Sequence, residues 1–175
     1  MKQTLLIITA VMLAYFINGC AATVPLTEEE KSYQKVIEFD SSKDELFIKS
    51  LDWSTSKFTG SHQLVFKTTL LDPGVLLETG VQHSDKETGV IISNGYVKIV
   101  TFPVLQIKYS CRIDCKENRV RFTFSNFQYW FDISVNIRNW ADIQKGQLTK
   151  LHPELDKLIE DYKTKIKSQT LDSDW

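Results

Sequence analysis

Apolar and polar residues alternate most regularly between positions 105 and 124. The apolar positions are Leu105, Ile107, Tyr109, Cys111 and Ile113 and, after a polar turn, Val120, Phe122 and Phe124. A period of two places alternate side chains on opposite faces of a strand, so the pattern predicts a β-hairpin with one buried face. A loop at 116–117, or a longer one at 115–118, sets the register. The predicted cross-strand pairs are Ile113 with Val120, Cys111 with Phe122, and Tyr109 with Phe124.

Two other segments repeat their apolar residues at helical spacing. The first helix is predicted to start after Ser42, because Ser42 and Glu45 have the spacing of a capping box. Its apolar positions are Leu46, Phe47, Leu51 and Trp53, and its solvent-facing positions are Lys43, Lys49 and Asp52. The second helix is C-terminal, with Pro153 in its first turn. Its apolar positions are Leu151, Leu155, Leu158, Ile159, Tyr162 and Ile166, which predict one face packed on a sheet.

Further strands are predicted before and between these elements. Residues 33–39 form the first strand, ended by polar residues that lead into the first helix. Residues 75–83 and 90–100 form two strands joined by a turn. Asn94-Gly95 is expected to interrupt the second of them with a bulge or another tight turn.

The order of these elements predicts an α+β fold. We expect an antiparallel sheet of about five strands in the order β-α-β-β-β-β-α, with both helices packed on one face. Residues 62–71 fit either a strand or a short helical insert. Residues 127–140 are rich in aromatic side chains and show no regular period, so they are predicted to be irregular.

The N-terminal segment is typical of an exported protein. Lys2 supplies a positive charge, and the uncharged residues 5–17 are fewer than the roughly 20 needed to cross a bilayer. The next residues, Ile17-Asn18-Gly19-Cys20, resemble the lipobox of bacterial lipoproteins, although Asn18 departs from the usual small or aliphatic residue. The resemblance implies cleavage between Gly19 and Cys20 and lipidation of Cys20. The alternative is an ordinary secretory signal with an incidental cysteine.

Cleavage at that point defines the predicted organisation. Removing residues 1–19 from the 175 leaves 156, which suits one domain with its own core. The segments are a signal peptide at 1–19, a lipidated N-terminus and tether at 20–31, a single α+β domain at 32–168, and a short polar tail at 169–175. The residue after the cysteine is Ala21 and not an aspartate. In lipoproteins sorted as in enterobacteria, which this chain resembles at its lipobox, that implies an outer-membrane lipoprotein facing the periplasm. Two or more acyl chains would anchor it stably to the membrane.

Several short motifs stand at fixed places in this element order. They are Ser42-Lys43-Asp44-Glu45-Leu46, Trp53, Lys86-Glu87-Thr88-Gly89-Val90-Ile91, the strand at 109–113, and Lys116 with Arg119-Val120-Arg121-Phe122. Together they resemble a family of uncharacterised bacterial envelope domains, described as a domain of unknown function with a TATA-box-binding-protein-like fold. The resemblance covers roughly residues 33–127, and the chain departs from it at 55–74 and 127–150. It implies a fold and no catalytic residue, because that family has no assigned activity.

The charge balance bears on the partners. The chain has 21 basic and 22 acidic side chains, for a net charge of −1. It therefore lacks the overall basic field that holds nucleic acid, and no nucleic-acid partner is expected.

Cys111 and Cys115 lie four residues apart on one predicted strand. Their α-carbons would then be roughly 13 Å apart, beyond the limit of about 7 Å for a disulfide. An internal bridge requires the chain to curl at Asp114. We otherwise expect Cys111 to be a buried thiol and Cys115 to lie at the turn.

No residue spacing indicates a catalytic, metal or cofactor site. His62, His83 and His152 are scattered, and none has the spacing of a metal ligand. No nucleophile elbow, zinc-protease motif or phosphate-binding glycine loop occurs.

Two stretches are possible partner contacts. Lys108, Arg112, Arg119 and Arg121 form a basic stripe on the outward face of the hairpin. The stripe is either a solvated sheet face or a docking surface for an acidic partner or a glycan. The second stretch is Tyr129-Trp130-Phe131, whose side chains cannot all enter one core from a strand. Either a neighbouring segment covers the outward ring, or the aromatics contact a partner or a sugar.

Two functional hypotheses follow. The preferred one is a lipid-anchored, non-enzymatic module of the cell envelope that binds or scaffolds another envelope protein or a glycan. The alternative is an envelope hydrolase or transferase whose site combines dispersed Asp and Glu residues with His62 or His83.

Overall fold

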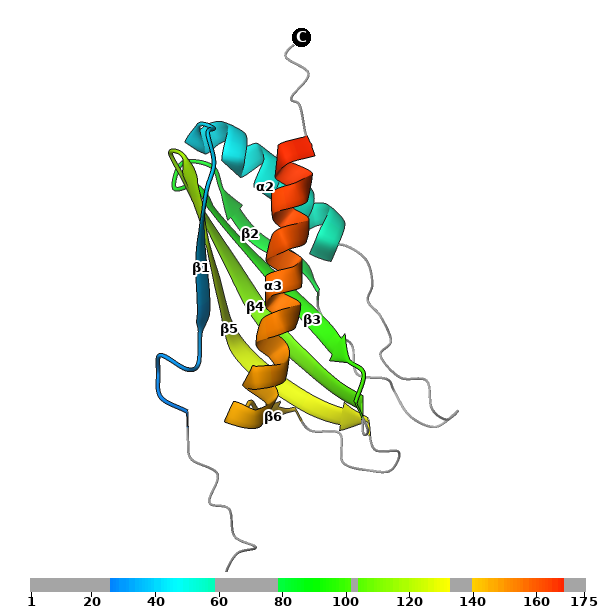
Figure 1. Cartoon of the computed structure of the whole chain (residues 1–175). Helices are drawn as coiled ribbons and strands as arrows, with labels where there is room; N and C mark the ends of the chain where they lie inside the picture. The colour runs from blue at the N-terminus through cyan, green and yellow to red at the C-terminus, as the bar shows by residue number, and fades with distance from the viewer. Residues whose placement is uncertain (1–25, 59–78, 102–103, 133–139, 169–175) are drawn as a thin grey trace, which may run out of the picture.

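The computed structural model describes residues 26–58, 79–101, 104–132 and 140–168. Its elements are β1 (Tyr33–Glu38), α2 (Lys43–Phe58), β2 (Gly80–Asp85), β3 (Val90–Ile99), β4 (Val104–Lys116), β5 (Arg119–Asp132), β6 (Ala141–Asp142) and α3 (Lys145–Ser168). The strands form a six-stranded antiparallel sheet in the order β1-β5-β4-β3-β2, and the short β6 pairs with β5 (Figure 1). The predicted fold class and element order are confirmed, with β6 as an additional strand. The predictions for residues 1–25, 62–71 and 169–175 lie outside the described residues.

Both helices pack on the same face of the sheet, which we call the covered face (Figure 1). Phe122 of β5 shows this directly, because its ring contacts Trp53 of α2 and Tyr162 of α3, at centroid distances of 6.0 and 4.8 Å. Trp53 and Tyr162 also contact each other edge to face at 5.1 Å. Aromatic contacts of this kind stabilise beyond the burial of their surface. The core of the domain therefore lies where the two helices meet the middle of β5.

The start of α2 agrees with its predicted cap, but one side chain does not lie where predicted. The Ser42 hydroxyl accepts a hydrogen bond from the backbone N–H of Glu45 at 3.3 Å. Lys49, predicted to face solvent, is only 7% exposed. Its ammonium pairs with Glu45 one turn earlier, at 2.8 Å. A long aliphatic stem can be buried while its charge is paired, and the helical wheel does not represent this.

The hairpin of β4 and β5 has the predicted faces but a different register. Cys115 pairs with Val120, Ile113 with Phe122, and Cys111 with Phe124, so the predicted pairs are wrong by two residues. A shift of two keeps every side chain on its face, which is why the alternation alone did not settle the register. The turn is at Glu117 and Asn118, and Asn118 takes a φ of 59°. Tertiary contacts hold this turn, because Asn118 bonds through its backbone to Phe39 at 2.9 Å and Ser41 at 3.1 Å.

Asn94-Gly95 does not interrupt β3, contrary to the prediction. The β3–β4 register runs from Val90 to Ile99 without a shift. Gly95 is required for another reason, since a Cβ there would lie 2.9 Å from the rings of both Phe58 and Tyr109. The glycine makes room for two packed aromatic side chains.

β5 continues through residues predicted to be irregular, as far as Asp132. Its register against β4 shifts between Lys108 and Ser110, and Asn126 has a φ of 55°. This β-bulge adds one residue to β5, so that Phe124 and Phe127 both reach the covered face. The extra residue breaks the period of two, which hid the strand from the pattern.

Candidate functional site

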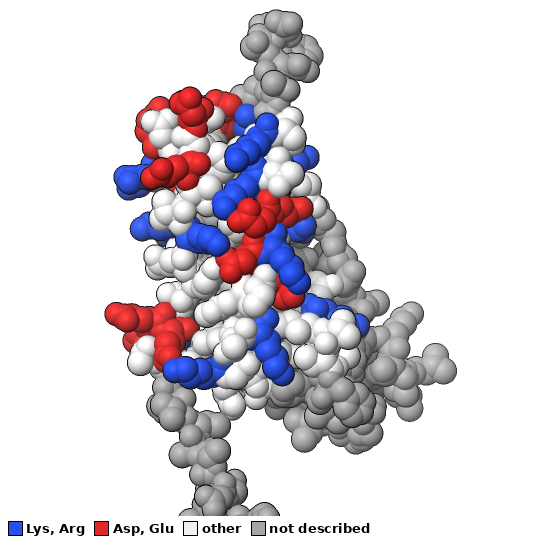
Figure 2. Space-filling view, viewed as in Figure 1, with Lys and Arg blue, Asp and Glu red and all other residues white. Residues whose placement is uncertain are grey.

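The sheet face opposite the helices is the main candidate for a binding surface, and we call it the open face. Residues that alternate with the core positions of β4 and β5 lie on it, and among the described residues no helix covers it. The helix side is a weaker candidate for a binding surface, because Figure 2 shows basic and acidic side chains interspersed over it. Many of these pair within one helix, as Lys157 does with Glu154 and Lys163 with Glu160. Such mixed surfaces are typical of solvated helices.

One end of the open face carries an arginine–aspartate cluster of Arg112, Asp114 and Arg121. Arg112 donates to one carboxylate oxygen of Asp114 through Nε at 3.0 Å and Nη2 at 2.8 Å. Arg121 donates to the other oxygen at 3.3 and 3.1 Å. The Asp114 side chain is 9% exposed, whereas both arginine side chains are 50% exposed. The carboxylate therefore holds two guanidinium groups in place while each keeps part of its surface in water.

The charges of this cluster shift the pKa values of its members. Burial raises the pKa of Asp114, but hydrogen bonds from Arg112 and Arg121 outweigh it, so the net pKa lies below the usual range. The hydrogen bond to Asp114 raises the pKa of Arg112. The predicted basic stripe is thus partly neutralised at its centre. Arg119 lies beside the cluster on β5 and is exposed.

The opposite end of the open face carries an aromatic cluster of Trp130, Trp140 and Lys108. Trp130 pairs with Gln106 across β4–β5, and its ring lies 6.3 Å from that of Trp140, which precedes β6. The Lys108 ammonium lies 4.8 Å from the centre of the Trp140 ring, within cation–π range. Gln106 is 2% exposed, and its Oε1 has no hydrogen-bond partner in the described part of the chain. Both indole rings remain partly exposed.

The predicted aromatic stretch divides between the two faces. Tyr129 pairs with the core residue Ile107 and packs against the covered face, whereas Trp130 lies on the open face. Phe131 pairs with Leu105 through the backbone, and its side chain lies outside the described residues. The sequence did not indicate the partnership of Trp130 with Trp140, because eight residues without a regular sequence period separate β5 from β6.

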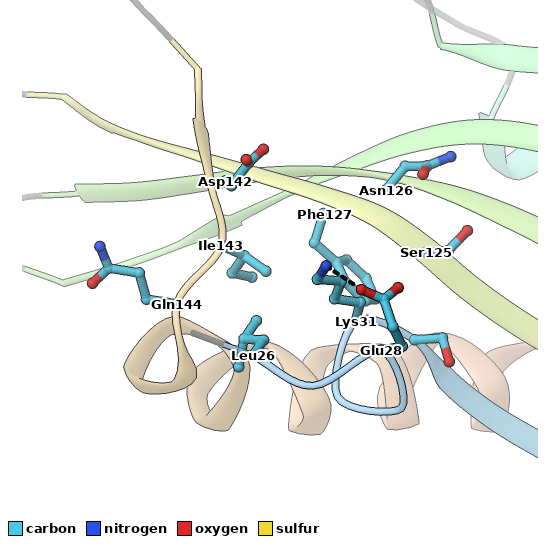
Figure 3. Close-up of a pocket in the computed structure, with 10 residues that line it drawn as sticks. Leu26, Glu28, Lys31, Ser125, Asn126, Phe127, Asp142, Ile143 and Gln144 are labelled. Atoms are coloured by element: carbon cyan, nitrogen blue, oxygen red, sulfur yellow. Dashed lines mark hydrogen bonds and ion pairs between the residues drawn. The ribbon is translucent and has the colours of Figure 1, made fainter. Parts of the chain in front are cut away.

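A surface pocket of about 750 Å³ lies at the edge of β5 between β1 and β6 (Figure 3). The β5 bulge, the turn that precedes β1, and the β6–α3 connection enclose it. Phe127 and Ile143, only 5% and 7% exposed, form its apolar part. Glu28 and Lys31 pair at its rim, as Figure 3 shows. Of the described residues that line the pocket, Glu28, Lys31 and Asp142 are ionisable, and the first two already form an ion pair with each other.

Of the three histidines considered in the sequence, the structure describes two, and they lie on different elements. His83 is exposed on β2, His152 stacks against Tyr33 with ring centres 4.7 Å apart, and His62 lies outside the described residues. Within the described ranges, no three His, Cys, Asp or Glu side chains gather in a way that fits a metal ion. Neither described helix is long and apolar enough to cross a membrane.

Both described cysteines are buried free thiols on the covered face. Cys111 is buried as predicted, but Cys115 is not at the turn, since it pairs with Val120 inside the sheet and is 1% exposed. Burial raises the pKa of Cys115 to about 11. Its thiol donates to the Ser50 hydroxyl at 3.5 Å, and that hydroxyl also bonds the Tyr162 hydroxyl at 2.8 Å. A protonated thiol in such surroundings is unreactive, so neither cysteine is a site.

An antiparallel sheet with two helices on one face and the opposite face open defines a class of α+β domain. Within that class, residues 33–130 match the family described as "Domain of unknown function (DUF4468) with TBP-like fold", where TBP stands for TATA-box-binding protein. The match covers more than half of the chain, and the chain therefore belongs to this family.

Two solved structures share the fold. A TBP-like protein from Parabacteroides distasonis is 18% identical, with a TM-score of 0.60 over 83% of this chain and 98% of that one. A DUF4468 family protein from Bacteroides ovatus is 11% identical, with a TM-score of 0.55 over 87% of this chain and 94% of that one. No curated protein matches the sequence. At these identities the likeness establishes the fold alone.

Proposed function

We propose that this protein is a lipid-anchored binding module of the bacterial cell envelope, which recognises an envelope protein or a glycan and is not an enzyme. The observation that carries the proposal is the open face. It presents two guanidinium groups held by one buried carboxylate at one end and two partly exposed tryptophan side chains at the other. Arginine and tryptophan are the side chains most enriched where binding energy concentrates.

The proposed anchor fits the geometry of the domain. The first described residue, Leu26, lies beside the β6–α3 connection, whereas the β4–β5 turn lies at the opposite end of the sheet (Figure 1). From Cys20 to Leu26 an extended chain spans about 20 Å. A lipid on Cys20 would hold the domain by this end, with the arginine–aspartate cluster farther from the bilayer than the aromatic cluster. A binding partner would then approach the open face from the side of the domain, along the membrane surface.

The binding proposal is tested by photo-crosslinking in the native envelope. A photoreactive residue at Thr123, on the open face beside the arginine–aspartate cluster, is compared with one at Ile48, which is 47% exposed on α2. We expect Thr123 to capture a discrete product that Ile48 does not. In the same strain, the pair Arg112→Gln and Arg121→Gln or the single Trp130→Ala should reduce that product. Equal capture from the two sites, or none from Thr123, would contradict the proposal.

The anchor is tested separately by mass spectrometry of the mature N-terminus. We expect Cys20 to be the first residue and to carry lipid, and Cys20→Ala to lose membrane fractionation. Ala21→Ser is the matched control, because it leaves the cysteine in place. A mature chain cleaved elsewhere, or a Cys20→Ala protein that still fractionates with membranes, would refute lipidation.

A further inference from the structure

Among the described strands, β1 forms one edge of the sheet and pairs only with β5. The β1–β5 register continues to Phe39, whose N–H donates to the carbonyl of Asn118 at 2.9 Å. In an antiparallel ladder, backbone groups of alternate residues point to opposite sides. Tyr33, Lys35 and Ile37 therefore direct theirs to β5, and Gln34, Val36 and Glu38 direct theirs to the free edge. In Figure 1 no other described element lies beyond this edge.

The free edge has features that favour pairing with another strand. Val36 is 57% exposed, one of three large exposed hydrophobic residues in the described chain, and its side chain lies on the open face. Inward-pointing charges normally protect such edges, and Lys35 is in that position. Here its ammonium is already paired with Asp156 of α3. The charge that would oppose an incoming strand is thus neutralised within the chain.

We propose that β1 pairs antiparallel with β1 of a second copy of this protein, about a two-fold axis at Val36. Facing residues of antiparallel strands must lie on the same sheet face, so only even–even and odd–odd pairings are allowed. The pairing centred on Val36 places Val36 opposite Val36, and Gln34 opposite Glu38 of the second copy. It uses the free backbone groups of all three residues, in about six hydrogen bonds. A centre at Lys35 would set Glu38 opposite Ser32, which lies before β1, so fewer of these hydrogen bonds would form within the two strands.

Such pairing joins the two sheets and their open faces into one continuous surface. β5 and β1 of one copy would be followed by β1 and β5 of the other. Three strand spacings of about 4.8 Å place the two Arg121 α-carbons about 14 Å apart. Two arginine–aspartate clusters would then lie side by side, which increases avidity for a partner with repeated groups. Because only three residue pairs hold the strands, we expect weak association in solution and stronger association when the chains share a membrane surface.

The test is sedimentation equilibrium on the unlipidated mature chain, with Cys20→Ser in every sample. We expect a concentration-dependent dimer. Gln34→Lys places a lysine opposite Glu38 of the second copy and should tighten the dimer severalfold, whereas Gln34→Glu should weaken it by a similar factor. Val36→Pro removes only an edge-facing N–H and should give a monomer with an unchanged melting temperature. A second readout is disulfide formation by Val36→Cys, compared with Ile48→Cys.

The outcomes separate clearly. A chain that stays monomeric at the highest concentrations, with Gln34→Lys equally monomeric, overturns the proposal. So does a dimer that responds to neither Gln34 variant, or one in which Ile48→Cys crosslinks as fast as Val36→Cys. If Val36→Pro unfolds, the two Gln34 variants and the cysteine crosslinks still test the proposal. None of these results depends on whether the open face binds a partner.

Discussion

The two faces of the same sheet differ in what their side chains do. On the covered face, Phe122, Phe124 and Ile113 are fully buried beneath two helices. On the open face, the neighbouring residues are Thr123 and the ion-paired Arg112, Asp114 and Arg121. Each strand contributes to both faces in alternation. The comparison teaches that packing on one side defines the fold, which leaves the other side available for recognition.

The largest expected effect comes from truncating the centre of the covered face. Phe122→Ala removes a ring that contacts Trp53, Phe124 and Tyr162. We expect a loss of about 3–5 kcal/mol in the free energy of unfolding, measured by urea denaturation. Thr123→Ala, the next residue on the open face, should change it by less than about 0.5 kcal/mol. Similar losses at the two positions would refute the distinction between the faces.

Overpacking the covered face is the second test. Gly95→Ala places a Cβ 2.9 Å from Phe58 and Tyr109, and we expect a loss of about 1–3 kcal/mol in unfolding free energy. Gly146→Ala is the control, because nothing lies within 4 Å of its Cβ and alanine favours the helix. Calorimetry should show opposite shifts of melting temperature for the two variants. A neutral Gly95→Ala would mean that the rings move aside freely.

The strongest polar contribution on the open face is expected from Asp114. Because its pKa is lowered in the folded state, it stabilises the protein above its unfolded pKa of about 3.9, and this is lost as the pH falls through the folded value. Asp114→Ala should cost about 1–2 kcal/mol at neutral pH, and less in acid. Unfolding curves at pH 7 and pH 3 measure the difference. A cost that is the same at both pH values would contradict the ion-pair account.

The smallest expected effect concerns one buried hydroxyl. Tyr162→Phe keeps the ring in place but removes the bond to Ser50, and should cost about 1 kcal/mol in unfolding free energy. Ser50 retains the Cys115 thiol as a donor, which limits the loss. Tyr162→Ala provides the comparison, since it also removes the ring contacts. Equal costs for the two variants would show that the hydroxyl matters more than the packing.

The candidate site was only partly predictable. The alternation placed Arg112 and Arg121 on one face, but it treated Asp114 as one more polar position and not as the residue that holds both. At least one ring of Tyr129-Trp130-Phe131 was expected to face outward, but the pattern did not say which one. The structure places Trp130 there, and the pairing of β6 with β5 brings Trp140 to it. Pairing across a bulge and an intervening segment leaves no periodic signal.

The sequence by itself determined the element order, the two helical faces, and which side chains of the hairpin are buried. These follow from periodicity, because hydrophobic burial depends on the face a residue occupies. Only the tertiary structure decided the register, since a shift of two residues preserves every face and contacts of Asn118 with Phe39 and Ser41 select one. It also decided that Lys49 is buried, that Gly95 makes room for two aromatic rings, and that β1 has a free edge. Each of these depends on what lies opposite a residue in space, which no local pattern contains.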